Sequence, residues 1–238
     1  QMSKVRLSEI SLIPQGAMNS LNPVIRIKEQ LLDGLLDHGI KFTPEEKRLK
    51  VAELLEWVEL PVSVGEMYPH ELSGGMKQRI CIAIAISMRP KLVVADEPTS
   101  ALDVVVQRQI MGTVDRLRAE MGISLILIGH DMGLMAQSVD RLGVMYAGRM
   151  AELGDMVDVI KQPLHPYSQL LIKTLPLLTN RGHFEGIQGI TPSLLNPPDG
   201  CLFAPRCPFA MAECKTGKPA WVEVRPDHWV ACNLHKEN

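Results

Sequence analysis

The 238-residue sequence has no apolar run long enough to cross a membrane. Its longest apolar stretches, Ile80–Ile86 and Ile123–Ile128, fall far short of the roughly 20 residues that a transmembrane helix needs. It also lacks a basic excess, since 25 Lys and Arg stand against 27 Asp and Glu. A general nucleic-acid-binding protein usually carries such an excess, so we expect no nucleic-acid partner. The composition predicts a protein that is soluble or reaches a membrane only through partners.

Cysteine is scarce until the end of the chain. Four of the five cysteines lie in the last 38 residues, and ten of the 17 prolines lie at or after Pro163. The remaining cysteine, Cys81, lies in an apolar helical run and is interpreted as a small core residue. The C-terminal third is therefore expected to be built differently from the rest.

The first two thirds alternate between helical and strand patterns. Helices are predicted over 24–36, 43–58, 74–88 and 104–121, strands over 92–95 and 124–128, and a hairpin over 141–146 and 149–152. Short apolar strands that alternate with helices are typical of a buried, mainly parallel sheet. The predicted fold class is therefore α/β.

Two adjacent carboxylates follow the apolar run Leu92–Ala95. Ligands of parallel sheets bind at the carboxyl ends of strands, where Asp96 and Glu97 are expected to lie. One carboxylate there can hold Mg²⁺ beside substrate phosphates, and its neighbour can orient or deprotonate an attacking water. Because Asp-Glu also occurs at strand ends by chance, this pair alone is weak support for a catalytic site.

A glycine-containing turn, Ser73-Gly74-Gly75, precedes the helix predicted over 74–88. Two glycines let the backbone approach a ligand closely, and free N–H groups at a helix start favour an anion such as phosphate. An ordinary serine-capped helix start explains the same three residues equally well.

Taken together and in order, these segments resemble the ATPase subunits of ABC transporters. The resemblance covers a signature motif (Leu72–Arg79), a Walker B motif (Leu92–Glu97), a D-loop (Ser100–Asp103), a switch histidine (His130) and a Q-loop glutamine (Gln15). It implies a P-loop NTPase core of the ABC type with a helical subdomain, and ATP with Mg²⁺ as ligands.

The resemblance also implies a role for each matching residue. Asp96 would hold Mg²⁺ through water, and Glu97 would polarise the attacking water as a catalytic residue. His130, the second catalytic residue, would contact the γ-phosphate. Gln15 would contact the metal and the water while relaying the nucleotide state to membrane subunits.

Five further nucleotide-binding residues follow from the same resemblance. Ser73, Gly74 and Gly75, with Gln78 in the same motif, would act on the nucleotide bound by the opposite subunit of a head-to-tail dimer. Asp103 would lie at that dimer interface. The implied partners are a second ATPase subunit, identical or different, and two transmembrane permease subunits, with an extracytoplasmic solute-binding protein acting indirectly.

A P-loop motif, Gly-x-x-x-x-Gly-Lys-Ser/Thr, is missing from the sequence. Its only Gly-Lys pair, Gly217-Lys218, is followed by Pro219. We therefore expect this polypeptide by itself neither to bind nor to hydrolyse ATP normally, and the strand over 92–95 to lack sheet neighbours. Gln1 before Met2 adds the expectation that the 238 residues are a fragment of a longer protein.

The C-terminal part narrows the resemblance. His165-Pro166-Tyr167, the segment 200–208 and the cysteines that follow look like the extension of ATPase subunits from oligopeptide/dipeptide-type importers. The expected domains are a partial ABC ATPase domain over 1–162 and this extension over 163–238. Within the former, we expect the helical subdomain at about 22–90 and the Walker B to switch-histidine region at about 91–152.

Four cysteines, Cys201, Cys207, Cys214 and Cys232, have the spacing Cys-x5-Cys-x6-Cys-x17-Cys. Clustered cysteines indicate disulfides or a metal site, and the reducing cytosol implied by the resemblance disfavours disulfides. The absence of Cys-x2-Cys pairs disfavours zinc, whereas four thiolates suit the 4Fe-4S cluster that related subunits carry. Zinc and unligated thiols remain the alternatives, and the expected role is structural.

The resemblance favours an ATPase subunit that energises an importer of di- or oligopeptides from the cytoplasmic face of the membrane. The same subunit type also serves oligosaccharide or nickel uptake. A non-catalytic iron–sulfur interaction module without a P-loop is a second alternative, although it would not need Glu97 and His130. DNA-repair ABC ATPases are disfavoured because the sequence lacks their coiled-coil heptads and basic surface.

Overall fold

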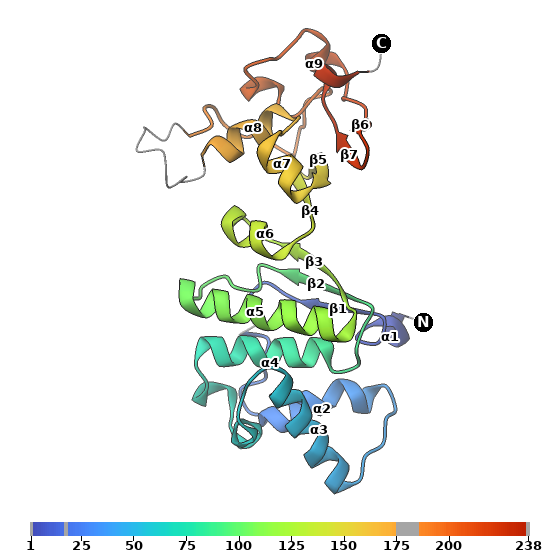
Figure 1. Ribbon diagram of the computed structural model, residues 1–238, viewed down its shortest axis with the longest axis vertical. Coiled ribbons are helices and arrows are strands. Elements are labelled where there is room, and N and C mark those ends of the chain that lie inside the picture. Colours follow the sequence, from blue (N-terminus) through green and yellow to red (C-terminus); the bar gives the residue numbers. More distant parts are fainter. Residues whose placement is uncertain (1, 17–18, 175–185, 237–238) are drawn as a thin grey trace. The chain divides into compact units, whose positions relative to one another are not determined.

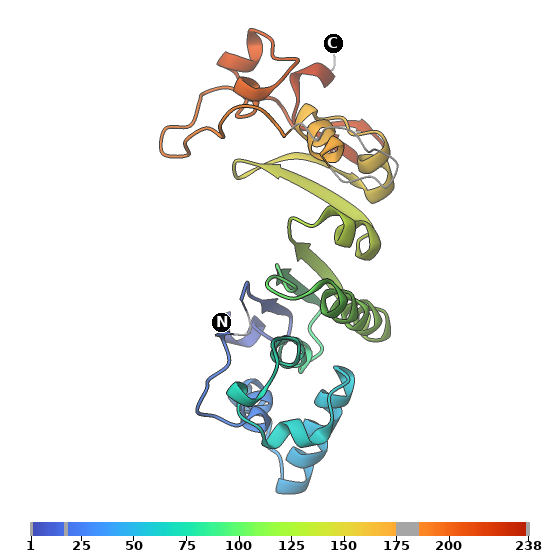
Figure 2. The same ribbon diagram turned by 90° about the vertical axis from the view of Figure 1, so that its left-hand side faces the viewer.

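The computed structural model describes residues 2–16, 19–174 and 186–236. Its contacts divide the chain into two compact units, Gln1–Leu134 (the first unit) and Met135–Asn238 (the second unit). Figures 1 and 2 show the elements of each unit. Within the described residues, no helix is both long and apolar enough to span a membrane.

The first unit is built on a three-stranded parallel sheet. Its strands are β1 (Ile10–Ile13), β2 (Leu92–Asp96) and β3 (Ser124–Ile128), in the order β1-β2-β3. The register pairs Ile10 with Leu92 and Leu92 with Ser124. The predicted α/β class and the parallel sheet are confirmed. Strand β1 was not predicted, because four residues are too few to give a clear strand pattern.

Helices cover one face of this sheet. Helix α4 (Gly74–Ile86) packs against β1 and against α5 (Val104–Met121), and α2 (Ile27–Asp37) and α3 (Pro44–Trp57) lie on the far side of α4, as Figure 1 shows. The shorter helices of this part are α1 (Met2–Val5) and two 3₁₀ turns at Val62–Glu66 and Pro69–Glu71. The boundary between the two units falls within α6 (Met132–Ser138).

Local capping signals set the ends of the main helices. The Thr43 hydroxyl accepts a hydrogen bond from the Glu46 N–H at 3.3 Å, and the Glu46 carboxylate accepts one from the Thr43 N–H at 2.6 Å, which completes a capping box at α3. Helix α5 begins after Asp103, whose carboxylate caps it, and ends at Gly122 with φ 66°. That left-handed conformation costs glycine little, so the helix stops there.

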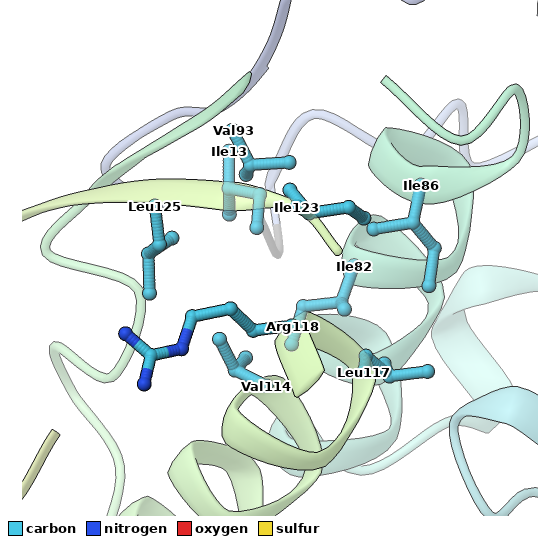
Figure 3. A pocket seen from close by; sticks show the side chains of 9 residues that line it. All are labelled: Ile13, Ile82, Ile86, Val93, Val114, Leu117, Arg118, Ile123 and Leu125. Carbon is cyan, nitrogen blue, oxygen red and sulfur yellow. The ribbon is translucent and has the colours of Figure 1, made fainter. Parts of the chain in front are cut away.

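Figure 3 shows the space between the sheet and the two helices beneath it. A cavity of only about 20 Å³ remains there, lined by Ile13 and Val93 from the sheet, by Ile82 from α4 and by Val114 from α5, among others. Its walls are almost entirely aliphatic, and its volume is that of a packing defect. This cavity is therefore core and not a ligand site.

The opposite face of the sheet is apolar but exposed. Side chains alternate along the strands, so Ile10 (46% exposed), Leu12 (58%), Ile126 (49%) and Ile128 (47%) point away from the helices. The prediction that the strand over 92–95 lacks sheet neighbours is wrong, because β2 pairs with β1 on one side and with β3 on the other. What is left uncovered is this face of the sheet. A two-sided apolar strand pattern is typical of parallel sheets that are covered on both faces.

The second unit contains a four-stranded antiparallel sheet in the order β4-β5-β7-β6. Its strands are β4 (Arg141–Tyr146), β5 (Arg149–Asp155), β6 (Val222–Arg225) and β7 (His228–Val230). The remaining elements are α7 (Met156–Lys161), α8 (Pro166–Lys173), α9 (Glu213–Thr216) and 3₁₀ turns at Ala204–Arg206 and Asn233–His235. The predicted hairpin is confirmed as β4 and β5.

Strand β5 joins the hairpin to the C-terminal part of the chain. It pairs Glu152 with Val230 and Leu153 with Trp229 of β7. The compact units therefore divide before the hairpin, whereas the sequence places a domain boundary at residue 163. Pairing between segments so far apart in sequence has no local signal that could predict it.

A buried polar cluster ties the second unit together. The Glu152 side chain is 0% exposed and accepts hydrogen bonds from the backbone N–H groups of Leu164 (2.8 Å) and His165 (2.9 Å). Its Oε1 lies 2.8 Å from Nε2 of the buried His228. A buried carboxylate is tolerated only when hydrogen bonds replace its water, as they do here.

Candidate functional site

Three of the predicted site residues meet at the carboxyl ends of the parallel strands. Gln15 follows β1, Glu97 follows β2 and His130 follows β3. The Gln15 Nε2 amide donates to Oε2 of Glu97 at 2.9 Å, and Nδ1 of His130 lies 3.2 Å from Oε1 of Glu97. Both oxygens of the Glu97 carboxylate are thus oriented by neighbours from other loops.

The backbone at the end of β2 directs Glu97 into this position. Glu97 has φ 45°, a left-handed conformation that is uncommon for a residue with a side chain. Its N–H donates to the carbonyl of Ile128 at 2.9 Å, and its own carbonyl accepts from the Ser100 N–H at 3.1 Å. Such local strain persists where surrounding contacts fix it and is enriched at functional sites.

Asp96 is the last residue of β2 and is half-buried. Its carboxylate makes no hydrogen bond or ion pair with any residue that the structure describes, so its oxygens remain available. The Oε1 atom of Gln15 is a second oxygen on the same edge of the sheet. Carboxylate and amide oxygens are ligands that Mg²⁺ accepts, so these residues fit a magnesium ion.

The signature segment forms the start of α4. The Ser73 hydroxyl caps the helix by accepting a hydrogen bond from the Met76 N–H at 3.3 Å, and Gly74 is the first helical residue. A Cβ on Gly75 would lie 2.8 Å from Cγ1 of Val106 in α5, closer than real Cβ contacts allow. Glycine at this position therefore lets the starts of α4 and α5 approach each other.

Asp103 and Gln78 complete the predicted nucleotide-binding set. The Asp103 carboxylate accepts hydrogen bonds from the N–H groups of Val105 and Val106, both at 3.0 Å. Gln78 is only 3% exposed, and its Nε2 has no hydrogen-bond partner among the described residues.

The predicted residues thus form two groups. No hydrogen bond or ion pair within the described ranges joins the signature and D-loop residues to Gln15, Glu97 or His130. The sequence pattern predicts the residues of both groups but not the contacts within them. The parallel sheet brings Gln15, Glu97 and His130 together. The burial of Gln78 has no clear signal in the sequence.

The four C-terminal cysteines face one small cavity. Cys201, Cys207, Cys214 and Cys232 all line it, together with His165. Asn233 donates a hydrogen bond from Nδ2 to the Cys214 sulfur at 3.6 Å, and backbone N–H groups of Phe203 and Ala204 face the Cys201 sulfur. Amide groups directed at sulfur stabilise thiolates, so this lining fits a thiolate-bound group.

The thiols of Cys201, Cys207 and Cys232 are disfavoured as anions. Burial is the main reason that the pKa of Cys232 is raised to about 11; the Leu234 N–H opposes the rise and the other three cysteines add to it. Burial likewise raises the pKa of Cys201 and Cys207. Thiolates here therefore need a nearby positive charge, as a metal centre would provide.

A single-ion metal site is not formed by these residues as they stand. No group of three or more His, Cys, Asp or Glu side chains in the described part of the chain is arranged to hold a metal ion. Cysteine ligands of a multi-iron cluster lie farther apart than those of one tetrahedral ion, because each binds a different iron. The geometry thus gives no support to zinc or to a cluster, and both stay predictions.

The His-Pro-Tyr segment has a structural explanation. Burial lowers the pKa of His165 to about 4, so the neutral ring accepts a hydrogen bond at Nδ1 from the Tyr167 N–H at 3.0 Å and caps α8. Pro166 occupies the first turn of that helix. Tyr167 packs against Tyr146 and Phe203, with ring centroids 4.7 and 5.4 Å away.

Two family models match the chain. Residues 1–100 match the ABC transporter family, and residues 151–214 match the family described as oligopeptide/dipeptide transporter, C-terminal region. The first contains Gln15, the signature segment and Glu97. The second contains His165 and three of the four clustered cysteines.

Curated relatives align over the whole chain. The dipeptide transport ATP-binding protein DppD of Caldanaerobacter subterraneus subsp. tengcongensis is 40% identical, covering 100% of this chain and 73% of that protein. The oligopeptide transport ATP-binding protein OppD of Escherichia coli is 43% identical, covering 98% of this chain and 69% of that protein.

Solved structures share the fold. A dimeric ABC transporter cassette, MJ0796, superposes with a TM-score of 0.58 at 28% identity, covering 65% of this chain and 66% of that one. CbiO1 of Clostridium perfringens gives the same TM-score at 26% identity, covering 71% and 64%. The motif order, both family models and the relatives agree: the chain belongs to the ATP-hydrolysing subunits of ABC transporters of the oligopeptide/dipeptide type.

Proposed function

We propose that Gln15, Asp96, Glu97 and His130 form the hydrolytic half of an ATPase site. The observation that carries this proposal is the hydrogen-bonded group of Gln15, Glu97 and His130 at the carboxyl ends of three parallel strands. Glu97, with both oxygens oriented, polarises the attacking water. His130, whose side chain is 83% exposed, is free to turn to the γ-phosphate and stabilise its developing charge.

Mg²⁺ would be held by Asp96 through water and by the amide oxygen of Gln15. When bound, the ion would neutralise charge on the phosphates. The Gln15 side chain would have two roles, because its Nε2 donates to Glu97 and its Oε1 would be left to contact the metal and the water. A change in nucleotide state would thereby reach the Q-loop.

We propose that Ser73, Gly74, Gly75 and Asp103 serve the nucleotide of a second ATPase subunit. Their separation from the Glu97 group supports a dimer in which each site combines parts of two subunits. Gln78 belongs to the same segment but is buried, so we place it behind the glycine turn, where it would position α4.

The test uses the assembled transporter with both ATPase subunits and the permease subunits. Glu97→Gln should lower ATP turnover by at least about 100-fold, the usual contribution of a general base, while nucleotide binding persists. Glu120→Gln is the matched control, since Glu120 is an exposed carboxylate on α5 whose one ion pair within the described residues is with Arg116 at 3.4 Å. Unchanged turnover in Glu97→Gln would refute the role.

We infer that the solute imported is a di- or oligopeptide. The relatives are named as dipeptide and oligopeptide transport proteins, and residues 151–214 match the family region of that type. The proposed partners are two permease subunits, a second ATPase subunit and, indirectly, a solute-binding protein. With these partners the chain would lie on the cytoplasmic face of the membrane. We retain residues 1–162 as the ATPase domain and 163–238 as the extension.

We propose that Cys201, Cys207, Cys214 and Cys232 bind a 4Fe-4S cluster in a structural role, for which the cavity of about 10 Å³ between them would widen. Support comes from four thiols around one cavity and from amide N–H groups directed at the sulfurs of Cys201 and Cys214. When bound, the cluster would supply cross-links between the loop at 200–214 and the C-terminal turn.

Iron and sulfide analysis of protein purified without oxygen tests the cluster directly. About four irons and four sulfides per chain are expected. Cys207→Ser should abolish the iron content, whereas Cys81→Ser, which changes a core thiol of the first unit, should leave it unchanged. Stoichiometric zinc, or thiols free of any metal, would overturn the proposal.

A further inference from the structure

A second cavity of the second unit lies beside the cysteine cavity and plays no part in the proposed ATPase. Its volume is about 430 Å³, within the range of small-molecule sites and well above a packing defect. It opens between the β4–β5 turn, the loop at 200–203 and the segment 218–221. His165, Cys201 and Phe203 line both cavities.

The floor of the larger cavity is apolar and closely packed. Tyr146 is 8% exposed, and Phe203 is 1% exposed and contacts it edge-on, with ring centroids 5.1 Å apart. Trp221 lines the wall and stacks on Trp229 at 6.4 Å. Aromatic side chains fixed by such contacts offer preformed surfaces for a flat or aliphatic ligand.

The charged side chains that line the cavity are both positive. Arg149 and Lys218 are exposed, and neither side chain makes a hydrogen bond or ion pair with any described residue. No Asp or Glu occurs among the described residues that line the cavity. Two unpaired cations over an apolar floor favour a negative charge at the mouth and an apolar body inside.

We propose that this cavity is a binding site for a small organic anion with an aromatic or aliphatic body. A zwitterion such as a free peptide fits poorly, because the lining offers no carboxylate for an ammonium group. Bound there, the ligand would contact Cys201 and bridge the hairpin to the cysteine loop. The site is independent of the ATPase residues, since every lining residue belongs to the second unit.

The probe for the test is 1-anilinonaphthalene-8-sulfonate, an aromatic anion whose fluorescence rises in apolar surroundings. Titration of the 238-residue protein should show a saturable site, with energy transfer from the nearby Trp221. N-phenyl-1-naphthylamine, which has the same body without the sulfonate, should bind at least tenfold more weakly. Added salt should lower the affinity for the anionic dye and leave the affinity for the neutral dye unchanged.

The decisive variant is Arg149→Ala/Lys218→Ala, which should raise the dissociation constant of the anion about tenfold. Lys161→Ala/Lys215→Ala is the matched control, since it removes the same charge from exposed positions of the second unit outside the cavity. That control should bind as the unchanged protein does. Equal loss in both double variants, no loss in either, or equal affinity for the neutral dye would overturn the proposal.

Discussion

The two units differ in what they bury. In the first unit, the described buried residues are aliphatic side chains with a few neutral polar ones, and Leu54, Ile80 and Ile110 are 0% exposed. In the second unit, Glu152, His165 and His228 are buried as well, all 4% exposed or less. Burial of apolar surface supports the first unit, whereas the second also depends on hydrogen bonds to groups that can gain or lose a proton.

The comparison predicts its largest stability effect at Glu152. Glu152→Ala leaves the Leu164 and His165 N–H groups and His228 without their partner, which should destabilise the second unit by about 4 kcal/mol. Hydrogen exchange followed by mass spectrometry should show lost protection after residue 135 and none before it. Glu213→Ala, which removes an exposed partner of Lys236, is the control and should have little effect.

In the first unit the largest effect should come from a cavity. Leu54→Ala in α3 removes a fully buried side chain and should cost about 3 kcal/mol. Leu49→Ala in the same helix is the control, because Leu49 is 56% exposed. Urea unfolding of the first unit measures both. Similar losses in the two variants would mean that the packing of α3 differs from the structure.

Acid should lower the stability of the second unit more than that of the first, because of His165. The pKa of His165 is lowered to about 4 because burial disfavours its charged form, with nearby His235 acting in the same direction and Glu152 opposing both. The unfolded chain, with an ordinary histidine pKa near 6.5, takes up a proton first as pH falls. The stability contribution is therefore complete above pH 6.5, and about 2 kcal/mol of it is lost by pH 5.

Urea unfolding of the second unit at pH 7 and pH 5 measures this loss. His165→Asn keeps a side-chain acceptor for the cap of α8 and removes the titrating group, so its stability should vary less with pH. An unchanged pH dependence in that variant would assign the acid sensitivity to other groups.

The same contrast explains how far the sequence predicts the structure. Helix α5 was predicted at its observed bounds, because Asp103 and Gly122 act on their own helix ends. The meeting of Gln15, Glu97 and His130 follows once strands are known to be parallel. The pairing of β5 with β7 and the burial of Glu152 were not predicted, since they join segments 76 residues apart and leave no local pattern.

The smallest predicted change in stability comes from two helix caps, and it can distinguish a residue that only caps a helix from one that also serves ATP turnover. Thr43 and Ser73 cap α3 and α4 through the same type of hydrogen bond, 3.3 Å long in both. Each change to alanine should cost about 1 kcal/mol of stability in the first unit. In the assembled transporter only Ser73→Ala should also lower ATP turnover, because only Ser73 lies in the signature segment. Equal turnover in both variants would reduce Ser73 to a helix cap, the interpretation that its sequence alone left open.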